Sequence, residues 1–255
     1  MMLVGLPGSG KSTYAKEVVE KCTNYIICSS DELRKEMFGD VDCQDKNGEL
    51  FQELHRRIYE NLLNGKNVIY DATNISSKKR MAFLREIKDI NCEKIAIVFT
   101  PPFMTCLANN QNRDRKVPET IIIRMYKNWQ TPFWFEGWDD IRVRRDVVYD
   151  YDINAYKGYD QNNPYHSRTL DNHMKLTAIL AKQKDPSLSL WTAARMHDIG
   201  KPFCRINDES GTSHYYGHQS VGAYDALALF GASLETSALI TYHMNPFSWK
   251  EEKAR

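Results

Sequence analysis

A glycine-rich segment at the start of the chain has the residue types that bind a chain of phosphates. Residues 5–12 read Gly-Leu-Pro-Gly-Ser-Gly-Lys-Ser, which matches the pattern GxxxxGK(S/T), and Thr13 follows. Glycines let the backbone wrap an anion with its N–H groups pointing inward. We expect a nucleoside triphosphate here, with Lys11 at its β- and γ-phosphates and Ser12 as a ligand of Mg²⁺. The expected contacts are Gly5, Pro7, Gly8, Ser9, Gly10, Lys11, Ser12 and Thr13.

A carboxylate and an arginine follow the second predicted strand. Ser29 and Glu32 have the spacing of a capping box, so a helix is expected to begin there. Asp31 and Arg34 would then share one face of that helix. A kinase needs such an ionised carboxylate beside the acceptor hydroxyl, to take its proton. A surface ion pair would show the same spacing, so both interpretations stay open.

Two further segments carry candidate ligands of the phosphates. Asp71 ends the third predicted strand, where a carboxylate faces the ligand crevice of an open α/β sheet. It could hold Mg²⁺ through water or orient Lys11. Arg113 and Arg115 lie in a polar loop and could stabilise charge on a transferring phosphate. Taken alone, such a loop is more often simply exposed.

Histidines gather in the second part of the chain, which holds six of the seven. His197 and Asp198 are adjacent at the end of a predicted helix, and imidazole with carboxylate suits Mn, Fe, Co, Ni or Zn. Further candidate ligands are His173, His214, His218 and His243. If residues 214–218 are helical, both of their histidines would point into one site. A lone His-Asp pair is usually a core histidine, but the clustering favours a metal site.

Alternating elements must position these groups in the first half. The expected strands are residues 1–4, 25–28, 67–70 and 94–100, with residues 142–148 as a candidate last strand. Residues 12–21 and 49–64 have helical spacing. This alternation predicts a parallel sheet with helices on both faces.

After about residue 150 the pattern changes. Residues 150–164 read as a linker. Beyond it we expect an all-helical region with helices at residues 173–182, 189–197, 218–229 and 233–243. The sequence thus predicts two domains, at residues 1–150 and 151–255.

Composition narrows the class of protein. The cysteines are scattered without a CxxC pair, which indicates a reducing cytoplasm. No run of about 20 apolar residues occurs and the N-terminus is not a signal peptide, so no membrane partner is expected. The net charge of +1 means that nucleic acid would need a local basic groove. Two basic clusters are candidates, each equally compatible with a solvated surface: Lys78, Lys79, Arg80 and Arg142, Arg144, Arg145.

The motifs of the first half resemble the phage-type polynucleotide 5′-kinase domain, an α/β P-loop kinase. They are Gly-x-Pro-Gly-Ser-Gly-Lys-Ser-Thr, Ser-x-Asp-x-x-Arg, Asp-x-Thr-Asn and Arg-x-x-x-Val-Pro, followed by Arg-Met-Tyr. The resemblance implies that Asp31 is the general base for a 5′-hydroxyl and that Arg34 holds the acceptor phosphate. It also implies that Arg113 contacts the donor phosphates from a lid. Where the family often has an earlier lid arginine, this chain has Asn109 and Asn110, and Arg115 would compensate.

The second half resembles the HD phosphohydrolase superfamily, an all-α domain, and in particular the HD domain of bacterial CCA-adding tRNA nucleotidyltransferases. The matching segments are residues 161–166, His173, residues 197–202 and residues 214–218. The resemblance implies metal-dependent hydrolysis of 2′,3′-cyclic, 2′- or 3′-phosphates, with Lys201 helping to neutralise the phosphate beside the catalytic Asp198. The expected metal ligands are His173, His197, Asp198, His218 and His243. HD domains usually add a later Asp, which is not found after His243, so we expect a truncated chain or an incomplete site.

Together these features predict a bifunctional enzyme that heals nucleic-acid ends. It would use ATP or another nucleoside triphosphate with Mg²⁺ to phosphorylate 5′-hydroxyl ends of RNA or DNA. A transition metal would serve the second site, and a ligase is the expected partner. One alternative is a kinase of a nucleoside or small metabolite joined to an HD nucleotidase. Another is a kinase with a non-catalytic HD module that binds RNA.

Overall fold

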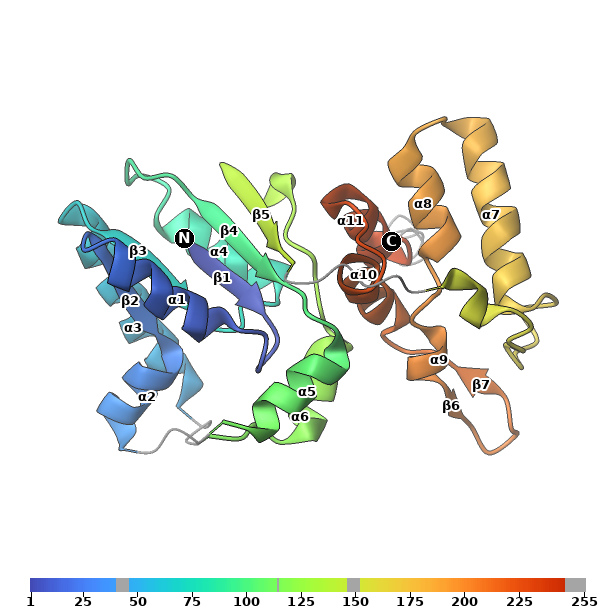
Figure 1. Cartoon of the computed structure of the whole chain (residues 1–255), viewed down its shortest axis with the longest axis horizontal. Coiled ribbons are helices and arrows are strands. Elements are labelled where there is room, and N and C mark those ends of the chain that lie inside the picture. Colours follow the sequence, from blue (N-terminus) through green and yellow to red (C-terminus); the bar gives the residue numbers. More distant parts are fainter. Residues whose placement is uncertain (40–45, 114, 146–151, 246–255) are drawn as a thin grey trace, which may run out of the picture.

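The computed structural model describes residues 1–39, 46–113, 115–145 and 152–245 (Figure 1). Its first half is built on a five-stranded sheet with strand order β2-β3-β1-β4-β5, in which every neighbouring pair is parallel. The strands are β1 (Met2–Gly5), β2 (Tyr25–Ser29), β3 (Asn67–Asp71), β4 (Ile95–Phe99) and β5 (Asp140–Arg144). The predicted parallel sheet is therefore confirmed. The last strand begins two residues earlier than expected, and residues 146–148 lie outside the described ranges.

Helices cover both faces of this sheet. They are α1 (Lys11–Lys21), α2 (Ser30–Phe38), α3 (Asn47–Leu63), α4 (Ser77–Glu86), α5 (Phe103–Gln111) and α6 (Glu119–Tyr126). Successive side chains of a strand point to opposite faces. Accordingly Leu3 packs with Ala15 of α1, while Val4 belongs to the cluster that contains Leu54 of α3 and Phe83 of α4.

The second half is helical, as predicted. It contains α7 (Leu170–Lys184), α8 (Leu188–Met196), α9 (Lys201–Cys204), α10 (His218–Ala228) and α11 (Leu234–Tyr242), with short 3₁₀ turns at η1 (Trp134–Glu136) and η2 (Ile153–Tyr156) preceding it. A small antiparallel hairpin, β6 (Ile206–Asn207) and β7 (Ser213–His214), was not predicted. Strands of two residues are too short to show a period in the sequence.

Helix α10 of the second half packs against the first half, and most of its residues are buried. The Tyr224 hydroxyl donates to the carbonyl oxygen of Pro101 at 2.6 Å. Tyr126 of α6 donates to Asp225, and one hydrophobic cluster contains residues of both halves. The expected boundary at residue 150 lies outside the described residues, so the division into two domains stays a prediction.

Three arginines of the two basic clusters make contacts within the protein. Arg80 is fully buried and binds Glu136, with Nε 2.7 Å from Oε2. Arg142 pairs with Asp140, and Arg145 donates to the Gly231 carbonyl oxygen at 2.9 Å. These contacts reduce the cationic charge that the two clusters could offer to nucleic acid. Among the helices described, none is both long and apolar enough to cross a membrane.

Two candidate active sites

The phosphate-binding loop connects β1 to α1 and has the conformation that its glycines allow. Gly8 and Gly10 have φ of 77° and 91°, a backbone conformation that residues with a Cβ rarely adopt. A Cβ on Gly8 would lie 2.2 Å from the Cys106 carbonyl oxygen, so α5 packs directly on the loop. Gly5 ends β1, Pro7 and Ser9 are buried, and Thr13 is exposed on the first turn of α1.

Lys11 is buried inside this loop. Its ammonium group donates to the carbonyl oxygens of Gly5 at 3.0 Å and Leu6 at 2.8 Å. Burial lowers the pKa of Lys11, and the nearby Asp71 carboxylate opposes that shift. The lysine is thus held beside the backbone that would cradle a triphosphate.

Ser12 and Asp71 meet at the carboxyl edge of the sheet. The Ser12 hydroxyl donates to Asp71 Oδ2 at 2.7 Å. Burial raises the pKa of Asp71, while Lys11 and the Ser12 hydroxyl lower it. A hydroxyl and a carboxylate are oxygen ligands of the kind that Mg²⁺ prefers, so the pair fits this cation.

Asp31 lies in the first turn of α2, where the Ser29 hydroxyl accepts from the Glu32 N–H as the capping box predicts. Arg34 Nη1 is 3.4 Å from Asp31 Oδ1. Arg115 Nη1 is 2.5 Å from the same oxygen, and Arg113 Nη2 is 3.6 Å from Oδ2. The structure therefore brings the candidate base and both loop arginines together.

Two asparagines hold the arginine loop, and sequence reasoning gave them no role. Asn110 is buried, and its amide pairs with both the N–H and the carbonyl oxygen of Val117. Asn109 donates to the Gly8 carbonyl oxygen at 2.9 Å. Asn110 thus closes the loop, and Asn109 fastens it to the phosphate-binding loop. One signal of this role was present in the sequence: the two asparagines stand where the resembling family often has a lid arginine.

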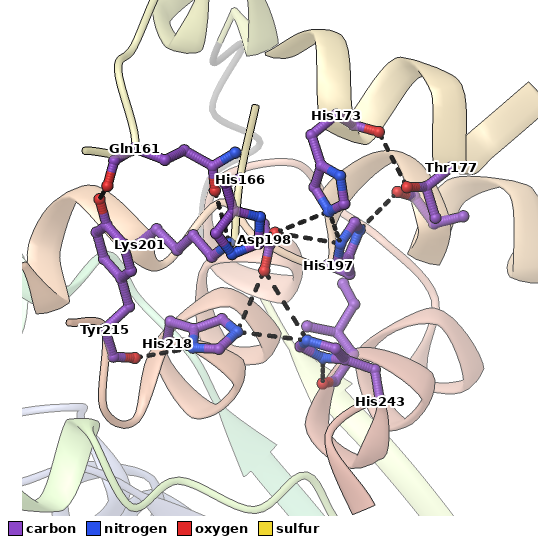
Figure 2. Close-up of polar contacts among 12 residues, drawn as sticks. Gln161, His166, His173, Thr177, His197, Asp198, Lys201, Tyr215, His218 and His243 are labelled. Carbon is purple, nitrogen blue, oxygen red and sulfur yellow. Dashed lines mark hydrogen bonds and ion pairs between the residues drawn. The ribbon is translucent and has the colours of Figure 1, made fainter. Parts of the chain in front are cut away.

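The second site is a cluster of four histidines around one aspartate (Figure 2). His173 comes from α7, His197 and Asp198 follow α8, His218 begins α10 and His243 follows α11. Asp198 Oδ2 lies 3.2 Å from His197 Nε2 and 3.3 Å from His173 Nε2. Asp198 Oδ1 lies 3.1 Å from His218 Nε2 and 3.9 Å from His243 Nε2. The five expected metal ligands therefore lie together.

Backbone contacts define the tautomer of three of these histidines. In His197, His218 and His243, ring Nδ1 lies 2.8 Å from the carbonyl oxygen three residues earlier, that of Ala194, Tyr215 and Ile240. A carbonyl only accepts, so Nδ1 carries the proton and Nε2 presents a lone pair. His218 Nε2 and His243 Nε2 are 3.3 Å apart. Two lone pairs this close favour a cation between them, so the donor set fits a divalent metal.

Asp198 and Lys201 are two buried groups of opposite charge within this cluster. Burial opposes ionisation of Asp198, but the surrounding imidazoles of His173, His197 and His218 hold its pKa well below the usual value. Lys201 Nζ lies 2.8 Å from Asp198 Oδ2 and donates to Gln161 Oε1 at 2.7 Å. The predicted phosphate-neutralising lysine is thus in the cluster, where it pairs with the aspartate.

His214 does not belong to the cluster. It lies in β7, and its Nε2 is 2.8 Å from Asp208. Residues 214–217 are not helical, since Gly217 adopts φ of 83° and α10 begins only at His218, so the condition under which both histidines would point into one site is not met.

The fold and the loop between β1 and α1 define the first half as a P-loop, kinase-like nucleotide-binding unit. The chain belongs to the AAA domain family, whose model matches residues 1–132. The HD domain model matches residues 170–255, so the histidine cluster lies in a region of HD type.

Individual relatives cover only part of the chain. The L-seryl-tRNA(Sec) kinase of Methanococcus maripaludis is 31% identical over 163 residues, which are 59% of this chain and 61% of that protein. A solved Pnkp1/Rnl/Hen1 RNA repair complex aligns with TM-score 0.45 and 23% identity, over 50% of this chain and 42% of the other. A gluconokinase from Sinorhizobium meliloti 1021 aligns with TM-score 0.39 and 17% identity, over 56% and 79% of the two chains.

Proposed function

We propose that the protein heals both ends of a broken nucleic acid. The first half would phosphorylate a 5′-hydroxyl at the expense of ATP or another nucleoside triphosphate. The helical half would remove a 2′,3′-cyclic, 2′- or 3′-phosphate. The observation that carries the proposal is that one chain holds two separate clusters of charged and metal-ligating side chains, one around Lys11 and Asp31 in the phosphate-binding half and one of four histidines around Asp198.

In the kinase half, each residue has a role that its position supports. Asp31 would accept the proton of the acceptor hydroxyl, with Arg34 beside it for the acceptor phosphate. Lys11 and the loop arginines, Arg113 and Arg115, would stabilise charge on the transferring phosphoryl group. Because both loop arginines contact Asp31 here, they must turn away from it before a hydroxyl can approach. Ser12 and Asp71 would hold Mg²⁺, which supplies positive charge at the phosphates when bound.

In the helical half, two groups of three ligands share Asp198: His173 and His197 on one side, His218 and His243 on the other. They would hold a divalent transition metal such as Mn²⁺, Fe²⁺, Co²⁺, Ni²⁺ or Zn²⁺. When bound, the metal supplies Lewis-acid polarisation of a phosphate ester. Lys201 would neutralise a phosphate oxygen at the edge of the cluster.

Nucleic-acid ends are the proposed partners, and a ligase is the class of enzyme that would consume the product. Sealing requires a 5′-phosphate and a free 3′-hydroxyl, which these two reactions would create. A reducing cytoplasm is part of the proposal, and the five described cysteines, all free thiols, agree with it.

A second candidate acceptor is a hydroxyl carried by an aminoacylated tRNA. The 31% identity to a kinase named for L-seryl-tRNA(Sec) favours it. Both candidates keep Asp31 as base and differ only in what presents the hydroxyl.

The test uses an oligonucleotide with a 5′-hydroxyl and a 2′,3′-cyclic phosphate, incubated with ATP and Mg²⁺ or Mn²⁺ while both termini are analysed. We expect a 5′-phosphate at one end and loss of the cyclic phosphate at the other. Free nucleosides and seryl-tRNA, added as competing acceptors, report the acceptor class. Preferred transfer to either competitor would contradict the proposed substrate.

A further inference from the structure

A large cavity lies between the two halves, on the α3 and α4 side of the sheet. Its volume is about 1000 Å³. It is lined by α3, α4, the segment after β3, the end of α6 and the turn that precedes α10. Pockets for small ligands range from about 300 to 1000 Å³, so this space is large enough for more than one nucleotide.

One end of the cavity adjoins the acceptor side of the kinase site. Asn47 lines the cavity, and its Oδ1 accepts from Arg34 Nη2 at 2.8 Å. Thr73 also lines it, and its carbonyl oxygen accepts from the Gly5 N–H at 3.0 Å. A chain that enters the kinase site beside Arg34 can therefore continue into this space.

The lining has the chemistry that binds single-stranded nucleic acid. It includes Lys79 and Lys127, and none of its described residues is acidic. Phe51 and Tyr216 offer aromatic rings; Tyr216 is 70% exposed and stacks on His214 with the rings 5.7 Å apart and 2° from parallel. Cationic groups that follow a backbone, together with rings on which bases stack, are the features of such grooves.

The helical half forms one wall of the cavity, and that wall is fixed in place. Gly217 has φ of 83°, and a Cβ there would lie 2.8 Å from the Lys127 carbonyl oxygen. The turn therefore packs directly on the backbone after α6, with Tyr216 and Gln219 facing the cavity. His218, a member of the histidine cluster around Asp198, lies between those two residues.

We infer that this groove binds the single-stranded nucleic acid behind the acceptor hydroxyl, with Lys79 and Lys127 at backbone phosphates and Tyr216 stacked on a base. The inference rests on the proposed function and adds that the helical half selects the kinase substrate. A nucleoside or a minimal dinucleotide would not reach Tyr216, so its phosphorylation would be independent of the groove.

The experiment compares kinase KM values for a 5′-hydroxyl dinucleotide and a 12-nucleotide strand, at saturating ATP. The variants are the double substitution Lys79→Ala with Lys127→Ala, and Tyr216→Ala. The matched controls are Lys78→Ala, next to Lys79 but outside the groove, and Tyr165→Ala, which is 90% exposed elsewhere. We expect about a tenfold rise in KM for the long strand in the groove variants. The kcat, the KM for ATP and the KM for the dinucleotide should stay unchanged, and the double variant should weaken the salt dependence of binding.

The outcomes separate the two claims. If the wild type phosphorylates both acceptors and the groove variants behave like their controls, the groove inference is overturned and the proposed function stands. If the wild type phosphorylates no oligonucleotide but does phosphorylate a small hydroxyl compound, the proposed function is overturned and the inference with it.

Discussion

Asp31 is the proposed base of the phosphoryl transfer. It is surrounded by Arg34, Arg113 and Arg115, so its charge is already balanced before any substrate arrives. The arginine loop is held by Asn109 and Asn110, which leaves its tip to exchange one anionic partner for another. A triphosphate offers those arginines more negative charge than one carboxylate does, and this would free Asp31 for the acceptor.

Substituting Asp31→Asn should lower kinase kcat by about 10²- to 10⁴-fold, because the amide cannot take the proton of the hydroxyl. Phosphate removal by the helical half should be unchanged. The matched control is Glu32→Gln, an exposed carboxylate in the same helical turn. Near-normal transfer by Asp31→Asn in a steady-state assay would show that another group is the base.

Substituting His197→Ala should abolish phosphate hydrolysis and reduce the bound metal, since the lone pair at Nε2 is lost from the cluster. Kinase activity should remain. His214→Ala is the control, because this histidine pairs with Asp208 outside the cluster. Metal analysis of the purified proteins by mass spectrometry would contradict the assignment if both variants kept equal metal.

At the scale of elements, one buried ion pair ties α4 to η1. Arg80 and Glu136 are both fully buried, and Glu136 also accepts from Trp138 Nε1 at 2.9 Å. This contact fixes the helix that carries Lys79, a residue of the proposed groove. Pairs of this kind stabilise little on their own, but removing one partner leaves a buried charge.

Substituting Glu136→Gln should therefore lower the free energy of unfolding by about 3–5 kcal/mol, measured by urea denaturation. Asp140→Asn is the control; it removes the half-buried partner of the exposed Arg142 and should change stability by less than about 1 kcal/mol. Equal effects of the two substitutions would mean that the Arg80 contact is not buried in solution.

Local patterns predicted much of both elements and sites. The capping box at Ser29, the phosphate-binding loop and the four later helices depend on neighbours a few residues apart, and the structure contains all of them. The roles of Asn110 and Gly217 depend on contacts that form only after folding, with Val117 and with the Lys127 backbone. Spacing alone also could not exclude His214 from the cluster, because helical periodicity does not reveal the left-handed turn at Gly217.

At the scale of the whole molecule, helix α10 contributes a residue to one site and packs against an element of the other. His218 at its start belongs to the histidine cluster around Asp198, while the Tyr224 hydroxyl lies 3.4 Å from Cys106 Sγ, whose backbone packs on Gly8. Contacts between residues more than 100 positions apart cannot be inferred from local spacing. The shared core therefore emerged only from the structure.

Burial of the Asp225 carboxyl, which the hydrogen bond from Tyr126 only partly offsets, should make the stability of the protein depend on pH. Burial raises the pKa of Asp225 to about 7, against about 3.9 for an unfolded chain. Because the pKa is raised in the folded state, the contribution of protonated Asp225 to the free energy of unfolding is complete below pH 4 and is lost as the pH rises to 7. Asp225→Asn cannot ionise, so its stability relative to the wild type should rise across this window, by about 1 kcal/mol per pH unit. If the difference between the urea midpoints of the two proteins stayed constant from pH 4 to 7, this prediction would be contradicted.

The most direct test of the central claim is the intact mass of one oligonucleotide, with a 5′-hydroxyl and a 2′,3′-cyclic phosphate, after treatment with wild type, Lys11→Ala or His197→Ala protein and ATP. We predict that the wild type changes both ends, that Lys11→Ala changes only the 3′ end and that His197→Ala changes only the 5′ end. If either substitution abolished both changes, or if the wild type altered only one end, the chain would not carry two independent phosphate sites.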